Sequence, residues 1–202
     1  MSDDFITTQA QAWHQIATQF YGRDTVNGPG STMAATEHVR AGLRDLLDRH
    51  NVRTMLDAPC GDQNWIRHID LDGIDYTGWD VVEDLVTDNA VRFPDRRFAV
   101  RNLLQHDFPR VDLILCRDFT IHLPTAEVAS LLTRFKASGS HWLLTTHYPG
   151  GHNDYTFPES GHDNRPGYWA HPWNLEIAPF NLAGRVEAIR EDDDHELVLY
   201  QL

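Results

Sequence analysis

Short apolar runs recur along the chain and predict strands buried in a sheet. They cover residues 52–57, 75–80, 97–100, 111–116 and 141–148, and the fourth, VDLILC, is the most continuously apolar. Runs of this kind that alternate with helical segments are typical of parallel strands covered on both faces. The pattern therefore predicts an α/β chain with a mostly parallel sheet.

Helical periodicity fills the intervals between these runs. Apolar residues recur every three to four positions before residue 21, from a cap at Ser31 or Thr32 to about residue 50, over 82–93, and after Pro124. The apolar faces hold Trp13, Ile16, Ala17 and Phe20 in the first helix, Val39, Leu43, Leu46 and Leu47 in the second, and Val128, Leu131, Leu132 and Phe135 in the last.

The end of the chain departs from this alternation. Two strands are predicted at 184–190 and 195–202, and the short acidic turn between them indicates an antiparallel hairpin. The preceding segment, 149–183, is rich in Gly, Pro, His and aromatic residues and has no clear period. Long loops in compact domains are often lids or binding loops, so we interpret this segment as the cover of a substrate site.

The first strand ends in a tight turn, Asp57-Ala58-Pro59-Cys60-Gly61, and a helix-compatible segment follows. Backbone N–H groups at such a turn are expected to point outward unpaired and to bind a ligand, although a glycine turn can also be only a turn. The second strand ends in Asp80. It follows the turn by about 20 residues, where a dinucleotide fold places a carboxylate that accepts hydrogen bonds from ribose hydroxyls.

The glycine pattern disfavours a dinucleotide. GxGxxG is absent, because Pro59 and Gln63 occupy positions where glycines would lie. Asp62 adds negative charge where a pyrophosphate needs positive potential. A zwitterionic ligand with an ammonium group suits Asp57 and Asp62 far better.

This segment resembles the first motif of the class I S-adenosylmethionine-dependent methyltransferases, D-x-G-x-G-x-G, of which Asp57 and Gly61 are present. The DAPCGD form with the following Asn64-Trp65 is similar to a bacterial subgroup of that family. The resemblance implies a Rossmann-like seven-stranded sheet, mostly parallel with a C-terminal antiparallel hairpin, with helices on both faces. It also implies one domain over 1–202, divided into N-terminal helices over the cleft (1–50), a cofactor-binding core (51–148), a substrate lid (149–183) and a closing hairpin (184–202).

The cofactor implied by the resemblance is S-adenosylmethionine. Asn102 stands where the family usually has an aspartate that meets the adenine amino group, and Leu103 would pack on the ring; an amide can accept the same hydrogen bond. Tyr21 is a candidate contact to the cofactor carboxylate, or else a packing residue. The expected cofactor-binding residues are Tyr21, Asp57, Ala58, Gly61, Trp65, Asp80, Val81, Asn102, Leu103, Arg117 and Asp118.

Candidates for catalysis follow the fourth and fifth strands, because ligands bind at the carboxyl ends of such strands. The protein must position the methyl acceptor and exclude water, and an acceptor that carries a proton also needs a base within hydrogen-bond reach. Asp118 and His122 are four residues apart, so they form either an acid-oriented histidine base on one helical turn or a capping aspartate and a packing histidine. His147 and Tyr148 follow the fifth strand. His147 is the base candidate favoured by position, or a histidine at the core edge. Arg117 binds an acidic substrate or the cofactor carboxylate, or pairs with a surface acid.

Composition and charge disfavour several classes of binding partner. The net charge of −13 disfavours nucleic acid, and no apolar run reaches the length of a membrane span. The first residues, MSDDFITT, lack a signal pattern, so we expect a cytoplasmic protein. Cys60 and Cys116 are expected to be reduced packing residues that lie close together. The twelve histidines match no tight ligand spacing, so no metal site is predicted.

The leading hypothesis is methyl transfer from S-adenosylmethionine to an oxygen or nitrogen of a small-molecule substrate, with the acceptor atom and the oligomeric state left open. One alternative is a nicotinamide-dependent oxidoreductase on a Rossmann fold, which the glycine pattern disfavours. The other is a non-catalytic binding module that retains the fold, which the presence of Asp80 disfavours.

Overall fold

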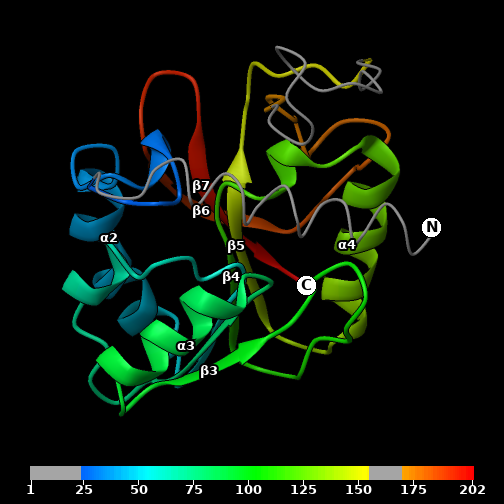
Figure 1. The fold of residues 1–202 in the computed structure, drawn as a ribbon. Coiled ribbons are helices and arrows are strands. Elements are labelled where there is room, and N and C mark those ends of the chain that lie inside the picture. The colour runs from blue at the N-terminus through cyan, green and yellow to red at the C-terminus, as the bar shows by residue number, and fades with distance from the viewer. Residues whose placement is uncertain (1–23, 155–169) are drawn as a thin grey trace.

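A computed structural model describes residues 24–154 and 170–202 of the chain, which form a seven-stranded sheet (Figure 1). The strands lie in the order β3-β2-β1-β4-β5-β7-β6. Their bounds are β1 (Thr54–Asp57), β2 (Asp75–Asp80), β3 (Arg97–Val100), β4 (Leu113–Cys116), β5 (Trp142–His147), β6 (Arg185–Arg190) and β7 (Glu196–Gln201). The first five strands are parallel, and β7 is antiparallel to both β5 and β6. The predicted fold class is confirmed.

The order of the strands reverses at β1. One edge of β1 pairs with β2, with Asp57 opposite Gly78, and the other edge pairs with β4, with Asp57 opposite Leu115. In open α/β sheets, ligands bind at the carboxyl ends of the strands where such a reversal occurs. This topology makes the end of β1 the expected position of a binding site.

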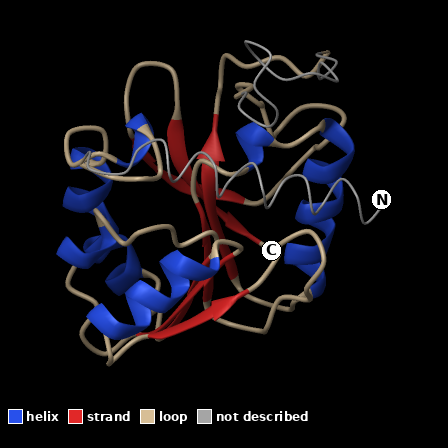
Figure 2. Cartoon of the chain, viewed as in Figure 1, coloured by secondary structure: helices blue, strands red, loops and turns tan. Residues whose placement is uncertain are grey.

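Helices cover both faces of the sheet (Figure 2). α2 (Glu37–Arg49) and α3 (Glu83–Arg92) lie on one side, and α4 (Thr125–Ala137) lies on the other. The buried side chains of α2 and α4 are those that the periodicity predicted. These are Val39, Leu43, Leu46 and Leu47 in α2, and Val128, Leu131, Leu132 and Phe135 in α4.

The strands divide their side chains between two cores, because successive residues point to opposite faces of a sheet. Leu113 and Leu115 of β4 pack in the core beneath α2, while Ile114 and Cys116 pack in the core beneath α4. All four are completely buried. This double burial is the reason that the strand reads as a continuous apolar run.

Two predictions about helices differ from the structure. α2 begins at Glu37 rather than after Ser31 or Thr32. The Thr32 hydroxyl instead stabilises a preceding turn, since it accepts the Ala35 N–H at 3.2 Å and donates to the Pro29 carbonyl at 2.9 Å. Between β1 and β2 the chain forms only a 3-10 helix, η2 (Ile66–His68), and no α-helix. The helix expected before residue 21 lies outside the described residues.

Part of the expected lid belongs to the hydrophobic core. Residues 155–169 lie outside the described residues, but Trp173, Leu175 and Leu182 are at most 3% exposed and pack beneath α4. The Trp173 indole Nε1 donates to the Leu123 carbonyl at 3.2 Å. The segment 170–182 is therefore held by core packing.

Both cysteines are free and buried, as predicted. Cys60 lies in the turn after β1, and Cys116 is the last residue of β4. Within the ranges that the structure describes, no helix has the length and apolar character needed to cross a membrane.

We expect Trp173→Ala to lower the free energy of unfolding by about 3–5 kcal/mol in urea denaturation, because it empties a buried site and removes the indole hydrogen bond. Ile177→Ala, at a side chain of the same segment that is 46% exposed, should change it by less than about 0.5 kcal/mol. Equal effects of the two variants would show that this segment is not part of the core.

Candidate functional site

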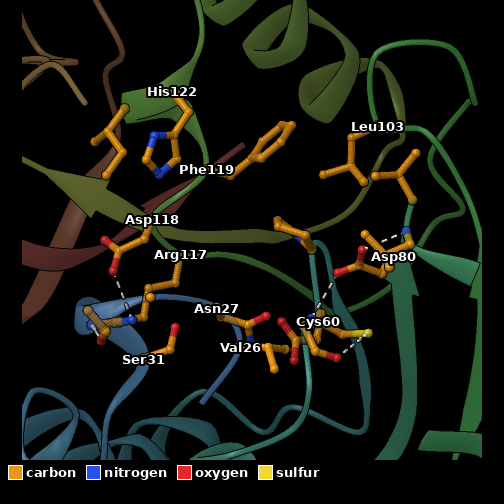
Figure 3. Close-up of a pocket in the computed structure, with 18 of the residues that line it drawn as sticks. Val26, Asn27, Ser31, Cys60, Asp80, Leu103, Arg117, Asp118, Phe119 and His122 are labelled. Atoms are coloured by element: carbon orange, nitrogen blue, oxygen red, sulfur yellow. Dashed lines mark hydrogen bonds and ion pairs between the residues drawn. The ribbon is translucent and has the colours of Figure 1, made fainter. Parts of the chain in front are cut away.

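A cavity of about 370 Å³ opens at the carboxyl edge of the sheet, beside the ends of β1 and β4. Its walls come from the loop 26–31, the turn after β1, the ends of β2, β4 and β5, residues 102–104 and His195. Arg117 and Asp118 lie toward one end of the cavity and Asp80 and Leu103 toward the other (Figure 3). The predicted site residues that line it are Asp57, Gly61, Trp65, Asp80, Val81, Asn102, Leu103, Arg117, Asp118 and His122.

The turn after β1 is fastened to its neighbours through Gly61. The Gly61 N–H donates to Asp80 Oδ2 at 2.9 Å, and its carbonyl accepts from Asn89 Nδ2 of α3 at 2.7 Å. Its backbone is left-handed, with φ of 53°, and an added Cβ would lie 1.9 Å from Asn27 Nδ2. The left-handed backbone and the close approach of Asn27 both favour glycine here. The expectation of outward, unpaired N–H groups is wrong at Gly61, because that N–H is bound inside the protein.

Asp80 ends β2 as a buried carboxylate that faces the cavity. Oδ1 accepts the Val82 N–H at 2.9 Å, and Oδ2 accepts the Gly61 N–H. Burial raises the pKa of Asp80, while the hydrogen bonds from the backbone act in the opposite direction. Because each carboxylate oxygen has a second lone pair, Asp80 can still accept hydrogen bonds from a ligand.

Asp57 is a second buried carboxylate at the same edge, 3% exposed. Its Oδ2 accepts a hydrogen bond from the Tyr76 hydroxyl of β2 at 2.6 Å. Burial raises the pKa of Asp57 to about 7. The cavity thus holds an acid whose charge changes near neutral pH.

Asp62 was expected to suit the ammonium group of a ligand, but it does not line the cavity. Its carboxylate instead binds the loop before α2. Its carboxylate accepts from the Thr25 hydroxyl at 2.8 Å, from the Val26 N–H at 3.0 Å and from Asn27 Nδ2 at 2.9 Å. These bonds hold residues 25–27 against the first turn, and the loop continues as a wall of the cavity. Asp62 positions this loop.

Arg117, at the end of β4, is buried in an ion-pair network. Its Nη2 lies 2.5 Å from Glu191 Oε2, and its Nη1 lies 2.9 Å from Asp118 Oδ2. Nη2 also donates to the Gly30 carbonyl at 2.9 Å, and the guanidinium lies over the Trp65 ring. Glu191 is itself buried, so pairing with a surface acid was the wrong alternative for Arg117.

An apolar wall lies beyond Asp80. Val81, Leu85, Leu103 and Leu104 line the cavity together with Asn102, and Leu103 lies at the end where Asp80 is found (Figure 3). The Asn102 Oδ1 accepts the Leu104 N–H at 2.9 Å, which shapes the turn after β3, and it keeps a second lone pair. This end suits a flat, largely apolar group with a polar edge.

Asp118 and His122 both line the cavity, but they do not share a turn of α-helix. Asp118 has a left-handed backbone with φ of 52°, and the 3-10 helix η3 (Thr120–His122) follows it. The Asp118 Oδ1 accepts from the Thr146 hydroxyl at 3.2 Å, and its other oxygen pairs with Arg117. The four-residue spacing therefore did not predict their arrangement.

His147 does not line the cavity. Thr146 contacts Asp118 and Tyr148 lines the cavity, so strand alternation directs His147 to the other face. Its buried ring accepts the Leu175 N–H on Nδ1 at 3.2 Å, and burial lowers its pKa. Ala58 is also fully buried away from the cavity, and Tyr21 lies outside the described residues.

Tyr148, a candidate by its place after the fifth strand, lies beside His195, which no sequence pattern assigned to the site. Their rings stack with centroids 5.1 Å apart at the cavity. The His195 Nδ1 lies 2.8 Å from Asp192 Oδ1, and its hydrogen bond with Glu191 raises the pKa of His195. The acidic turn 191–194, interpreted only as a hairpin connection, was the available signal.

The loop 26–31 was also missed as part of the site. Its sequence, Val-Asn-Gly-Pro-Gly-Ser, predicts only a break between helices, because two glycines around a proline cannot continue a helix. Gly30 lies so close to Asp118 that an added Cβ would be 2.7 Å from Oδ2.

Among the described residues, no group of three or more His, Cys, Asp or Glu side chains is arranged to hold a metal ion.

Comparison with solved structures identifies the fold. The chain is similar to 1,6-didemethyltoxoflavin-N1-methyltransferase from Burkholderia thailandensis, solved with 1,6-didemethyltoxoflavin and S-adenosylhomocysteine, with a TM-score of 0.66 and 16% identity over 95% of this chain and 88% of that one. The DhpI–SAH complex matches with a TM-score of 0.64 and 15% identity, over 98% of this chain and 97% of that one. Magnesium protoporphyrin IX methyltransferase from Synechocystis PCC 6803, solved with bound SAM, matches with a TM-score of 0.60 and 14% identity, over 100% of this chain and 98% of that one.

No protein-family model and no curated protein matches the sequence. At 14–16% identity the structural likenesses establish the fold alone. The chain has the Rossmann-like methyltransferase fold, with the antiparallel β5-β7-β6 arrangement at its end.

We expect Asp62→Ala to free the loop and lower the free energy of unfolding by about 2 kcal/mol, because hydrogen bonds to a charged acceptor are lost. Hydrogen exchange of the Val26 amide should accelerate selectively. Asp88→Ala, at an exposed acid of α3, is the matched control and should change neither quantity. Unchanged Val26 exchange in Asp62→Ala would show that Asp62 does not hold the loop.

Proposed function

We propose that the chain is an S-adenosylmethionine-dependent methyltransferase that acts on an oxygen or nitrogen of a small molecule. The observation that carries the proposal is the cavity at the carboxyl edge, which combines two buried acids, Asp57 and Asp80, with an apolar wall. The named neighbours include methyltransferases of 1,6-didemethyltoxoflavin and magnesium protoporphyrin IX, which supports a small-molecule acceptor.

The lining fits the chemical groups of this cofactor. Asp80 would accept hydrogen bonds from the ribose hydroxyls, and Asp57 would receive the ammonium group. Val81 and Leu103 would pack on the adenine, with the Asn102 amide at its polar edge. Arg117 lies toward the opposite end with its guanidinium over the Trp65 ring, and both side chains would face the amino-acid tail. Tyr21 remains a proposed carboxylate contact outside the described residues.

Bound S-adenosylmethionine supplies an electrophilic methyl group on a sulfonium. The protein then has to orient an acceptor, exclude water and take up any proton that the acceptor loses. His122 lines the cavity and is our choice for the base, in place of His147, which does not. Tyr148 and Phe119 would contact the acceptor. The segment 149–183 remains the proposed cover of the substrate site, and its residues 155–169 lie outside the described residues.

Binding is tested by thermal shift and calorimetry. S-adenosylhomocysteine should raise the melting temperature and NADH should not, which separates this function from a nicotinamide-dependent oxidoreductase. Asp80→Ala should weaken S-adenosylhomocysteine binding more than tenfold, that is by about 1.4 kcal/mol or more, because the ribose acceptors are lost.

Asp80→Asn keeps the shape of the side chain and should weaken binding in the same direction. Asp75→Ala, at the exposed start of the same strand, should bind normally. Unchanged affinity in both Asp80 variants would remove the ribose assignment.

His122→Gln should lower methyl transfer by about 100-fold or more, since a general base typically contributes that much. The assay would follow labelled methyl transfer to a panel of phenols, amines, sugars and carboxylic acids. Affinity for S-adenosylhomocysteine should stay within about twofold of the wild-type value, since a base contributes to the chemical step. His38→Gln, at an exposed position of α2, is the control. Full activity in His122→Gln would mean that His122 is not the base.

A further inference from the structure

Gln63 occupies a glycine position of the methyltransferase-like motif, and its backbone shows why glycine would suit it. It has φ of 61°, a left-handed conformation that residues with a side chain rarely adopt. The side chain is 1% exposed. A strained, buried glutamine in place of glycine indicates that its amide makes interactions that offset the strain.

Three hydrogen bonds fix the Gln63 amide. Its Nε2 donates to the Cys60 carbonyl at 3.1 Å and to the Tyr76 hydroxyl at 2.7 Å. Its Oε1 accepts from Arg96 Nη1 at 2.9 Å. The amide can take only this orientation, because the reverse would place its NH₂ group against the guanidinium.

The Tyr76 hydroxyl has one proton to donate. Because the oxygen accepts from Gln63, that proton goes to Asp57 Oδ2, 2.6 Å away. Tyr76 is 3% exposed, and the Arg96 guanidinium also lies over its ring. A single directed path of hydrogen bonds therefore runs from the positive charge of Arg96 to the carboxylate of Asp57.

We propose that Arg96, Gln63 and Tyr76 are positioning residues that hold Asp57 as an oriented carboxylate, ready to receive the cationic ammonium of an amino-acid ligand. This inference rests on the proposed function. It explains why the motif departs from glycine at Gln63, since a glycine there would break the path between Arg96 and Tyr76.

The charges around Asp57 set the direction of the effect. Burial raises its pKa to about 7, and the carboxylate of Asp80 raises it as well. Tyr76, Gln63 and Arg96 all act to lower it. The other titratable neighbours are the thiols of Cys60 and Cys116, whose pKa values burial raises above their usual range, so both stay neutral near pH 7. Asp57 therefore becomes a carboxylate as the pH rises through about 7, and affinity for a cationic group should rise over the same interval.

The experiment measures S-adenosylhomocysteine affinity by calorimetry across roughly two pH units on either side of that pKa. Tyr76→Phe removes only the hydroxyl and should move the midpoint upward by about one unit, which lowers affinity about tenfold below the midpoint and leaves it unchanged well above. Gln63→Gly restores the residue that the backbone prefers, so the fold is retained, and should move the midpoint in the same direction.

Two controls complete the design. Tyr200→Phe also deletes a buried tyrosine hydroxyl, one that contacts Glu176, and should leave the midpoint unchanged. Asp57→Asn should abolish the part of the pH dependence that belongs to the protein, since the ammonium group of the ligand titrates identically with every variant.

An unchanged midpoint in Tyr76→Phe and Gln63→Gly, or a loss of affinity that is equal at every pH, would overturn the proposal and leave these residues a purely structural role. A titration that follows the Asp57 carboxyl group in the unliganded protein should show the same upward shift of its pKa in Tyr76→Phe and Gln63→Gly. Failure of the proposed function would look different, because wild-type protein would then bind no S-adenosylhomocysteine at any pH while the carboxyl titration still separated the variants.

Discussion

Two acids, Asp57 and Asp80, are buried at adjacent strand ends, and burial of a carboxylate is unfavourable unless hydrogen bonds compensate for the lost water. The compensation comes from different sources in the two cases. Asp80 binds backbone N–H groups of Gly61 and Val82, whereas Asp57 depends on the Tyr76 side chain. The Gly61–Asp80 bond also fixes the turn after β1 to the end of β2. The shape of the site follows from this pairing of acids and donors.

The same region draws together segments that are far apart in the sequence. Asp62 holds the loop before α2, and Arg117 joins that loop to Glu191 in the turn between β6 and β7. A buried ion pair contributes little net stability by itself, but removing one partner leaves an uncompensated charge. The N-terminal loop and the C-terminal hairpin are therefore held to the end of β4 by charged contacts that tolerate little change, and they enclose the cavity between them.

The strands and the two acids were predictable because their signals are local. β2 was predicted residue by residue, since Asp80 ends an apolar run at a fixed distance from the turn. Asp62 was misjudged because its partners come from residues 25–27, more than 30 positions away, and no local pattern specifies them. His147 was favoured for its position at a strand end, but alternation along β5 turned it from the cavity. Gln63 was noted only as a missing glycine, and its function depends on Arg96 and Tyr76, which only the fold brings together.

We propose that Asp57 and Asp80 together bind one adenosyl ligand with an amino-acid tail at the carboxyl edge of the sheet. A crystal structure of the protein soaked with S-adenosylhomocysteine tests it most directly. We expect density in the cavity, with the ribose hydroxyls on Asp80 and the ammonium group on Asp57. An empty cavity at saturating ligand, or a ligand bound with its ribose away from Asp80, would contradict it.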